Sequence, residues 1–458
     1  MLCPVLKSVL YRPEAILAGT FGGLIAAGTL ALRLPVSHQG ETVGVVDALF
    51  TATSAVCVTG LVTVDTATAY SRFGQVVIVL LIQLGGLGIM TFAALAAQVF
   101  RVRLSFSSHA AWQGALFENQ ARLDLRRALR GIFVMTAIME AVGTVLLYTG
   151  MRGAAAHGGW FEAVFHSVSA FCNAGFSVYT DNVVALRDAP LVLWTLMGLI
   201  VGGGLGYTVL LEIFDRVRRR LHASREGPVL WSLHSRVVLK ASAGLVFGGA
   251  VLLLATGLTP DEETLGTRIT HAMFQSVTAR TAGFNSVNVG LLPVPSLLIL
   301  IGLMYIGGSP GSCAGGIKTS TAAVWLARVR ARLAGRVDVT LGGRRIPQDV
   351  VRRAALVISV ATIWNLVGVF ILSIGEAPHS GARLEQLIFE QISAFGTVGL
   401  STNIASPVSL SSLFGVVGKL WIALTMYVGR VGPLTLAMAV IPPPRALYEY
   451  PTERVMIG

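Results

Sequence analysis

The sequence carries little charge and few cysteines for its length. Only 13% of the 458 residues are Asp, Glu, Lys or Arg, whereas soluble domains average about 25%. Together with 54% hydrophobic residues and a mean hydropathy of +0.71, this excludes an ordinary soluble protein and indicates a polytopic membrane protein. The 4 cysteines form no CxxC pair and no metal-ligand spacing with histidine, so we expect neither a disulfide framework nor a metal centre.

Patterns typical of enzymes are also missing from the sequence. It has no G-x-x-x-x-G-K-[ST] phosphate-binding loop and no recurring Ser/His/Asp or histidine-rich constellation. The GGGLG run at residues 202–206 lies within an apolar span, so we interpret it as close helix packing and not as a dinucleotide site. We therefore expect no enzyme, and no nucleotide bound by this chain.

Long apolar runs dominate what is present. A spanning helix takes roughly 20 apolar residues, and candidates occur at residues 15–34, 74–100, 131–150, 191–214, 237–257, 297–326, 354–374 and 413–441. Shorter segments of about 13 residues cannot cross, and they lie at residues 45–57, 160–172, 266–279 and 383–395. Each short segment lies between the two spans of a pair, which predicts a half-helix that enters the membrane and returns.

Four similar polar loops follow these short segments. They read SAVCVTGLVT, SAFCNAGFSV, TARTAGFNSV and SAFGTVGLST, and their alignment brings Gly60, Gly175, Gly283 and Gly399 into register, at spacings of 115, 108 and 116 residues. We call residues 54–63, 169–178, 278–287 and 393–402 the glycine loops. The repeated unit of span, half-helix, loop and span organises the whole chain.

This repeat predicts an all-α polytopic membrane protein. Its four membrane-pore-membrane repeats comprise eight transmembrane helices and four re-entrant pore half-helices around a pseudo-fourfold central pore. We expect a single transmembrane domain over residues 1–458, with repeats at approximately 1–115, 116–230, 231–340 and 341–458.

The positive charge is concentrated in segments between the spans. Residues 1–12, 101–130, 216–240, 328–353 and 442–458 hold 25 of the 35 Lys and Arg residues, in a chain of formal net charge +12. Because Lys and Arg accumulate on cytoplasmic loops, we expect both termini in the cytoplasm and half-helices that enter from outside. We favour this topology over binding of nucleic acid or lipid headgroups as the reason for the charge.

The glycine loops have the composition of a cation pathway. Non-helical backbone at membrane depth must be buried in protein or line a watery cavity, and glycine lets its carbonyls turn inward. The loops contain no Asp or Glu, and their only charge is Arg280. Rings of neutral oxygen suit a monovalent cation, and the half-helix C-termini, each with about −0.5 of an elementary charge, favour one. The candidate carbonyls belong to Val58, Thr59, Gly60, Asn173, Ala174, Gly175, Thr281, Ala282, Gly283, Thr397, Val398 and Gly399.

The span after the third glycine loop is interrupted. Glycine costs about 1 kcal/mol and proline about 3 kcal/mol in a helix interior, so helix cannot persist through this stretch. The interrupting residues are Gly307, Gly308, Ser309, Pro310, Gly311, Ser312, Gly315 and Gly316. We expect a polar, glycine-rich break beside the pore, with helix resuming toward Trp325.

Some charged residues lie inside apolar spans. A charge at the bilayer centre costs at least about 2.5–3.5 kcal/mol, so Arg430 should face the pore or a buried partner. Lys318 fits either a gate or an anchor at the cytoplasmic interface. Arg280 is expected to brace the third glycine loop from behind, because a bare cation in the filter would oppose conduction. The role of Glu140 stays open.

The glycine loops resemble those of the Trk/Ktr/HKT superfamily of potassium transporters. Residues 307–321, GGSPGSCAGGIKTST, and the MYVGRVGP stretch around Arg430 strengthen the resemblance, which covers nearly the whole chain. The final PTERVMIG is most like the membrane subunits of bacterial Ktr systems, the KtrB type.

The resemblance implies uptake of K+ across a bacterial inner membrane, driven by the membrane potential, with a possible Na+ dependence. It implies that residues 307–316 with Lys318 form an intramembrane gate, and that Arg430 projects into the cavity below the filter. It also implies a homodimer regulated by a cytosolic ring of KtrA-type subunits that bind ATP, ADP or NAD(H). A Na+-preferring pore and a Na+/K+ or H+/K+ secondary transporter remain alternatives on the same framework.

Overall fold

The computed structural model describes residues 13–40, 42–105, 114–153, 158–221, 231–257, 264–404, 408–433 and 435. The expected basic segments 1–12 and 442–458 lie outside the described residues, as do parts of segments 101–130 and 216–240. The same holds for residue 434 and residues 436–441 of the last expected span.

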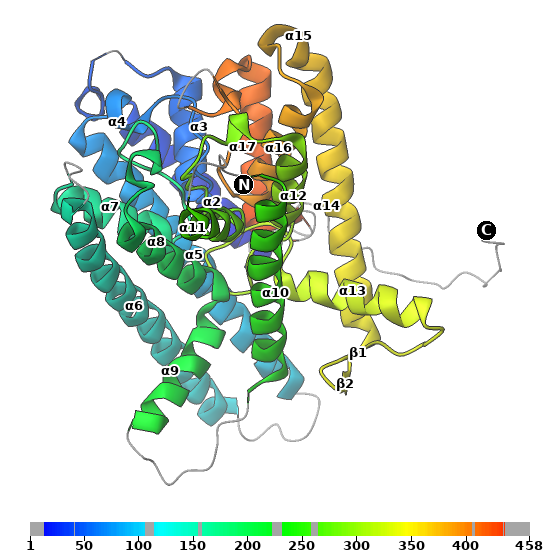
Figure 1. The fold of residues 1–458 in the computed structure, drawn as a ribbon. Helices are drawn as coiled ribbons and strands as arrows, with labels where there is room; N and C mark the ends of the chain where they lie inside the picture. The colour runs from blue at the N-terminus through cyan, green and yellow to red at the C-terminus, as the bar shows by residue number, and fades with distance from the viewer. Residues whose placement is uncertain are drawn as a thin grey trace, which may run out of the picture.

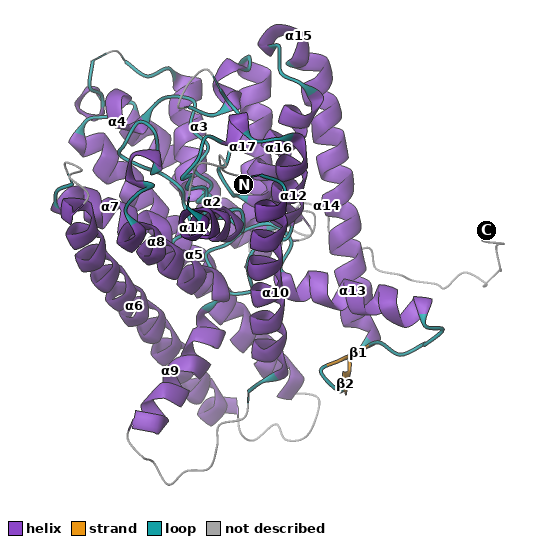
Figure 2. Ribbon diagram, viewed as in Figure 1, coloured by secondary structure: helices purple, strands orange, loops and turns teal. Residues whose placement is uncertain are grey.

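The regular secondary structure of the described chain is helical apart from one short hairpin, and loops join the helices (Figure 2). The first quarter contains α2 (Pro13–Leu32), α3 (Val45–Val56), α4 (Thr66–Ala69) and α5 (Arg72–Ser105). The second contains α6 (Gly114–Gly153), α7 (Trp160–Phe171), α8 (Pro190–Leu205) and α9 (Tyr207–Leu221). The third contains α10 (Leu233–Ala255), α11 (Leu265–Thr278), α12 (Val294–Tyr305) and α13 (Thr319–Leu333). Strands β1 (Thr340–Leu341) and β2 (Arg344–Arg345) then lead to α14 (Gln348–Gly375), α15 (Ala377–Ser380), α16 (Leu384–Gly396) and α17 (Val416–Val431).

The long apolar helices follow the predicted spans. Within the described residues, α2, α5, α6, α10 and α14 are each long and apolar enough to cross a membrane, and α8 with α9 makes one further, bent candidate. The predicted span 297–326 is divided into α12 and α13 by residues 306–318, which we call the intramembrane loop. In Figure 1, α10 and α14 run up the view and α13 lies across them.

The predicted span 191–214 is wrong as one continuous helix. It is bent by 110° between α8 and α9. The break falls at Gly206, whose φ of +86° lies in a region that residues with side chains avoid. The interpretation of residues 202–206 as helix packing therefore holds for only part of the run, since its last glycine ends the helix.

The four half-helices are α3, α7, α11 and α16. In each quarter, a helix that follows the half-helix packs on the half-helix of the next quarter. The pairs are α5 with α7, α8 with α11, α12 with α16, and α17 with α3. The last pair returns to the start of the chain, so the contacts close a circle. The loops that follow the half-helices gather at its centre (Figure 2).

Three glycines allow α5, α8 and α17 to approach the half-helix of their own quarter at van der Waals distance. A Cβ atom on Gly85, Gly203 or Gly429 would overlap the carbonyl oxygen of Val56, Phe171 or Phe395 respectively. Each of those oxygens lies at the C-terminal end of a half-helix. A larger side chain would therefore push the helix away from the loop at the centre.

Candidate functional site

The four glycine loops form a closed ring. Gly60, Gly175, Gly283 and Gly399 have φ values of +94°, +69°, +77° and +95°. A Cβ atom on each would collide with a carbonyl oxygen of the next loop, in the order Ala174, Ala282, Val398 and Thr59. The collisions follow the chain from the first loop to the fourth and back to the first, so the loops surround one axis.

The residue two positions before each glycine shares the same unusual backbone. Val58, Asn173, Thr281 and Thr397 have φ values of 55°, 61°, 84° and 49°. Such values cost free energy for residues with a Cβ atom. The four loops therefore repeat one strained conformation, and each turns its backbone in the same way.

Serines hold this conformation from within the half-helices. The backbone N–H of Gly60 donates to Ser54 Oγ at 3.0 Å, and that of Gly399 donates to Ser393 Oγ at 3.1 Å. Ser169, six residues before its own glycine, donates to the carbonyl of Phe176 at 2.8 Å. These buried bonds fix the loops on the ends of their helices.

A second set of buried side chains supports the loops on the outer side, and the sequence analysis missed it. His166 Nε2 is 2.9 Å from Ser177 Oγ, and His271 Nδ1 is 3.0 Å from Ser286 Oγ. In the fourth quarter, Glu390 accepts hydrogen bonds from Ser401 Oγ at 2.7 Å and from the backbone N–H of Ser411 at 2.9 Å. In the sequence, the sign of these supports is a polar residue inside an otherwise apolar half-helix, because a buried polar group needs a hydrogen-bond partner.

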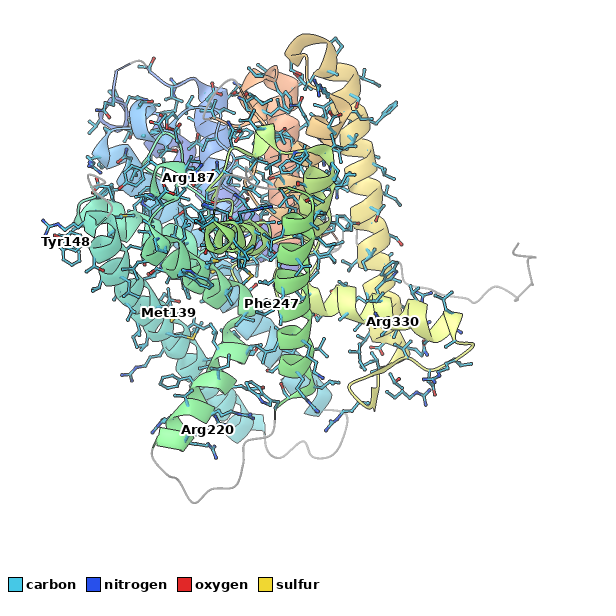
Figure 3. All side chains as sticks on the ribbon, viewed as in Figure 1. Met139, Tyr148, Arg187, Arg220, Phe247 and Arg330 are labelled. Carbon is cyan, nitrogen blue, oxygen red and sulfur yellow. The ribbon has the colours of Figure 1, made fainter. Side chains whose placement is uncertain are left out.

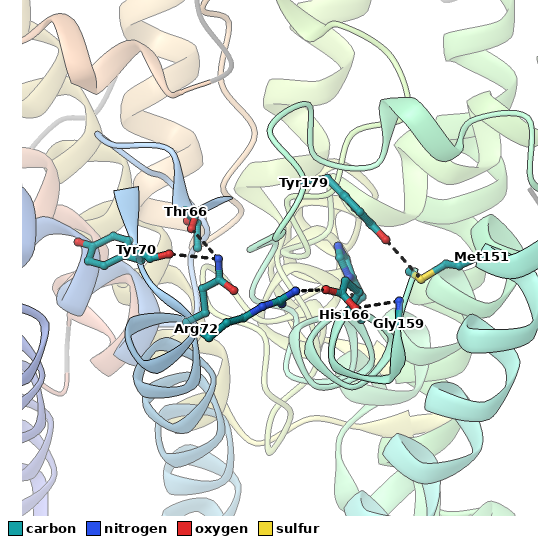
Figure 4. A network of polar contacts seen from close by, with 9 residues as sticks. Thr66, Tyr70, Arg72, Met151, Gly159, His166 and Tyr179 are labelled. Carbon is teal, nitrogen blue, oxygen red and sulfur yellow. Dashed lines mark hydrogen bonds and ion pairs between the residues drawn. The ribbon is translucent and has the colours of Figure 1, made fainter. Parts of the chain in front are cut away.

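An ion pair joins the N-terminal ends of α5 and α7 (Figure 4). Arg72 Nη2 lies 2.5 Å from Glu162 Oε1, and the other Glu162 oxygen accepts from the backbone N–H of Gly159 at 2.8 Å. Burial raises the pKa of Glu162, but the hydrogen bond and charge of Arg72 and the bond from Gly159 outweigh it and hold the pKa below its ordinary value. The carboxylate therefore caps the half-helix that carries the second loop.

A vestibule of about 440 Å³ opens onto the ring. Gly60, Gly283 and Gly399 lie at its base, and its walls include Asp181 and Asn285. These walls also carry amide and hydroxyl groups, which can hydrogen-bond water or a hydrated ion.

The intramembrane loop lies on the other side of the ring. A Cβ atom on Gly315 would overlap the hydroxyl of Thr397, and one on Gly307 would lie 3.3 Å from Thr281 Cγ2. A β-bridge between Ile306 and Ile317 closes the base of the loop. The predicted break is therefore present, and it directly underlies the third and fourth glycine loops.

The broken end of α8 holds this intramembrane loop. The backbone N–H of Ser309 donates to the carbonyl of Gly204 at 3.0 Å, and that of Cys313 to the carbonyl of Gly203 at 3.2 Å. Across the break, the N–H of Tyr207 donates to the carbonyl of Gly311 at 3.1 Å. Carbonyls at a helix C-terminus lack intrahelical donors, so the bend at Gly206 provides acceptors for the loop.

Arg430 connects the intramembrane loop to the rest of the bundle. The side chain is only 2% exposed. Its Nη1 donates to the carbonyl of Cys313, and its Nη2 donates to the carbonyl of Gly85 at 2.9 Å. Lys318 Nζ donates to the carbonyl of Ala314 at 2.5 Å, within the same loop.

Arg280 and Glu140 lie beside the ring and not in it. Arg280 donates to the carbonyl and hydroxyl oxygens of Ser242 at 3.4 and 3.3 Å, and to the carbonyl of Gly307 at 3.4 Å. These bonds link the loop after the third half-helix to α10 and to the intramembrane loop. Glu140 accepts from Gln83 Nε2 at 3.2 Å.

A closed ring of loops inside a bundle of apolar helices defines an integral membrane protein. Residues 16–448 match the TrkH family of cation transport proteins, and the chain belongs to that family. It is 36% identical to the potassium/sodium uptake protein NtpJ of Enterococcus hirae, with 97% of each chain covered. It is also 36% identical to the Ktr system potassium uptake protein B of Vibrio alginolyticus, over 98% of this chain and 95% of that one.

A solved structure has the same fold. The potassium transporter TrkH of Vibrio parahaemolyticus superposes with a TM-score of 0.72 at 17% identity, covering 94% of this chain and 84% of that one. The family prediction and the polytopic all-α fold class are therefore confirmed. The relatives are named as transport proteins, which agrees with the prediction that the chain is not an enzyme.

Proposed function

We propose that this chain takes up K+ through a central pore, driven by the membrane potential. The observation that carries the proposal is the closed ring of Gly60, Gly175, Gly283 and Gly399. In this proposal, backbone oxygens of the glycine loops replace the water around the ion. The coordinating residues are Val58, Thr59, Gly60, Asn173, Ala174, Gly175, Thr281, Ala282, Gly283, Thr397, Val398 and Gly399.

The chemistry of the ring favours a monovalent cation. No carboxylate lies inside the glycine loops, whereas pores for divalent cations more often use rings of Asp or Glu. The C-terminal ends of α3, α7, α11 and α16 meet the loops, and their partial negative charges stabilise a cation nearby. With one aligned glycine per loop, the ordered filter is shorter than TVGYG, so we expect weaker K+ selectivity than in tetrameric K+ channels.

The intramembrane loop is the proposed gate. It underlies Thr281 and Thr397, and Arg430 and the end of α8 bond to it. Arg430 also adds a positive charge below the ring, which opposes cation passage while the loop is in place. The gate residues are Gly307, Gly308, Ser309, Pro310, Gly311, Ser312, Gly315, Gly316, Lys318 and Arg430.

Regulation is assigned to a separate partner. Two relatives from different bacteria are named as Ktr system potassium uptake protein B. By analogy, we propose a homodimer in the bacterial inner membrane, with both termini in the cytoplasm and a cytosolic KtrA-type ring that binds ATP, ADP or NAD(H). The basic segments between the spans offer an attractive surface for such a ring.

Sodium is the second candidate ion. NtpJ of Enterococcus hirae is named as a potassium/sodium uptake protein. The alternatives are a Na+ dependence of K+ uptake, a Na+-preferring pore, or coupled Na+/K+ or H+/K+ transport on the same framework.

Expression in a bacterium that lacks its own K+ uptake systems tests the proposal. The chain, produced together with a KtrA-type partner, should restore growth at low K+ with or without added Na+. Failure to restore growth, with the protein detected in the membrane, would contradict K+ uptake. Growth only when Na+ is supplied would assign the Na+-dependent alternative.

A further inference from the structure

A lateral pocket of about 420 Å³ lies between α8 and α10, over α11. Figure 1 shows α11 nearly end-on between those two helices. The volume falls within the range of about 300–1,000 Å³ that is typical of small-molecule sites. Its walls are apolar and include Trp194, Met197, Val201, Leu239, Val246 and Phe247.

The pocket opens on a surface that the spanning helices present outward. Trp194 on α8 is 52% exposed and Phe247 on α10 is 60% exposed. Figure 3 labels Phe247 on α10. In a membrane protein, exposed apolar side chains on spanning helices contact lipid. A molecule dissolved in the bilayer can therefore reach the pocket without crossing water.

Arg280 is the only charged residue among those that line the pocket. Its three hydrogen bonds, to Ser242 and Gly307, are 3.3–3.4 Å long, beyond the usual range of about 2.7–3.2 Å. Its Nε is buried without a hydrogen-bond partner, and no carboxylate within the described part of the chain pairs with it. The guanidinium therefore has both charge and donor capacity available for an anion.

We propose that this pocket binds a single-chain amphiphile with a carboxylate head, of the fatty-acid class, taken from the bilayer. The carboxylate lies on the guanidinium of Arg280, where two parallel N–H···O bonds are possible. The hydrocarbon tail of the amphiphile lies between α8 and α10, against Trp194 and Phe247. Pairing two opposite charges inside the membrane lowers the cost that each would have alone.

The pocket borders the intramembrane loop, so a molecule bound there would contact the loop. Gly308 lines the pocket, and Arg280 donates to the carbonyl of Gly307. A carboxylate on Arg280 competes with that bond at the first turn of the loop. Any effect of the bound amphiphile on K+ transport rests on the proposal that the intramembrane loop is the gate. Binding of the amphiphile does not rest on that proposal.

The test uses the full chain in nanodiscs with a diazirine analogue of palmitic acid. Photolabelled peptides are mapped by mass spectrometry, with unlabelled palmitate and its methyl ester as competitors. Gly198→Leu fills the pocket, because Gly198 lines it and an added Cβ meets nothing within 4 Å. Gly244→Leu is the matched control, since Gly244 also lies in a spanning helix with nothing within 4 Å but is not among the residues that line this pocket. Arg280→Gln removes the charge.

Labelling should map to α8 and α10 and fall about tenfold in Arg280→Gln, the loss expected for a charge-assisted hydrogen bond. It should fall similarly in Gly198→Leu and stay unchanged in Gly244→Leu, and the methyl ester should compete poorly. Equal labelling of all variants, or equal competition by the ester, would overturn the assignment. A wild-type protein that is photolabelled at α8 and α10 but shows no K+ flux would count against the proposed function and not against this site.

Discussion

Arg430 donates hydrogen bonds to the carbonyl of Cys313 and to the carbonyl of Gly85, although these residues lie in different quarters of the chain. The arginine lies on α17, Cys313 in the intramembrane loop and Gly85 on α5. One buried side chain thus ties the loop below the ring to two helices. In the proposed mechanism, releasing this tie opens the ion path.

Arg430→Gln should raise K+ flux measured without a regulatory partner. Removing a bond to a charged group costs about 1.5–3 kcal/mol, which corresponds to roughly a tenfold shift or more toward the open loop. Flux is measured in proteoliposomes. Arg187→Gln is the control, because the Arg187 side chain is 39% exposed and forms an ion pair with Asp188 at 3.8 Å. Unchanged or lower flux in folded Arg430→Gln would argue against its role in gating.

Deleting residues 309–316 should also raise flux, because it removes the segment that underlies Thr281 and Thr397. Gly315→Ala is a milder variant in the same direction, since its Cβ would displace the loop from Thr397. Gly302→Ala is its control, because an added Cβ there meets nothing within 4 Å. Thermal unfolding establishes that each variant is folded. A folded deletion variant with unchanged or lost flux would count against the intramembrane loop as the gate.

The ion pair between Arg72 and Glu162 predicts an acid-sensitive stability. Because the pKa of Glu162 is lowered in the folded protein, its contribution is present above the ordinary pKa and is lost as pH falls through the lowered one. The melting temperature in detergent should therefore fall with acidification less steeply for Glu162→Gln than for the wild type. Asp188→Asn, at a carboxylate that is 84% exposed, serves as the control. Parallel curves for wild type and Glu162→Gln would contradict this assignment.

Removing K+ should destabilise the protein. A ligand that binds only the folded state stabilises it by about 2.7 kcal/mol at 100 times its dissociation constant. Exchanging K+ for N-methylglucamine should therefore lower the melting temperature of the wild type. Gly22→Ser, in α2 with open space around the added Cβ, should keep the shift, while Gly399→Ser should reduce it. An equal drop in melting temperature on removal of K+ in both variants would show that K+ does not bind at the ring.

The sequence predicted the parts of the molecule that repeat. The half-helices begin and end within one residue of the predicted segments, because a short apolar run before a glycine has few alternatives in a membrane. The bend at Gly206 was missed, since glycine in an apolar run is equally compatible with helix packing. The supports from His166 to Ser177 and from Glu390 to Ser401 depend on bonds between a half-helix and the loop beyond it, which spacing alone does not reveal.

If the four glycine loops form one ion filter, their glycines set the ratio of the Rb+ flux to the Na+ flux. Rb+ and Na+ fluxes are measured in proteoliposomes for the wild type, for Gly→Ser at positions 60, 175, 283 and 399, and for Gly22→Ser as control. Each ring glycine has positive φ and a carbonyl of the next loop where its Cβ would lie. We expect a changed Rb+/Na+ ratio in the four ring variants and an unchanged ratio in Gly22→Ser. An unchanged ratio in all four ring variants, with the proteins folded and active, would contradict it.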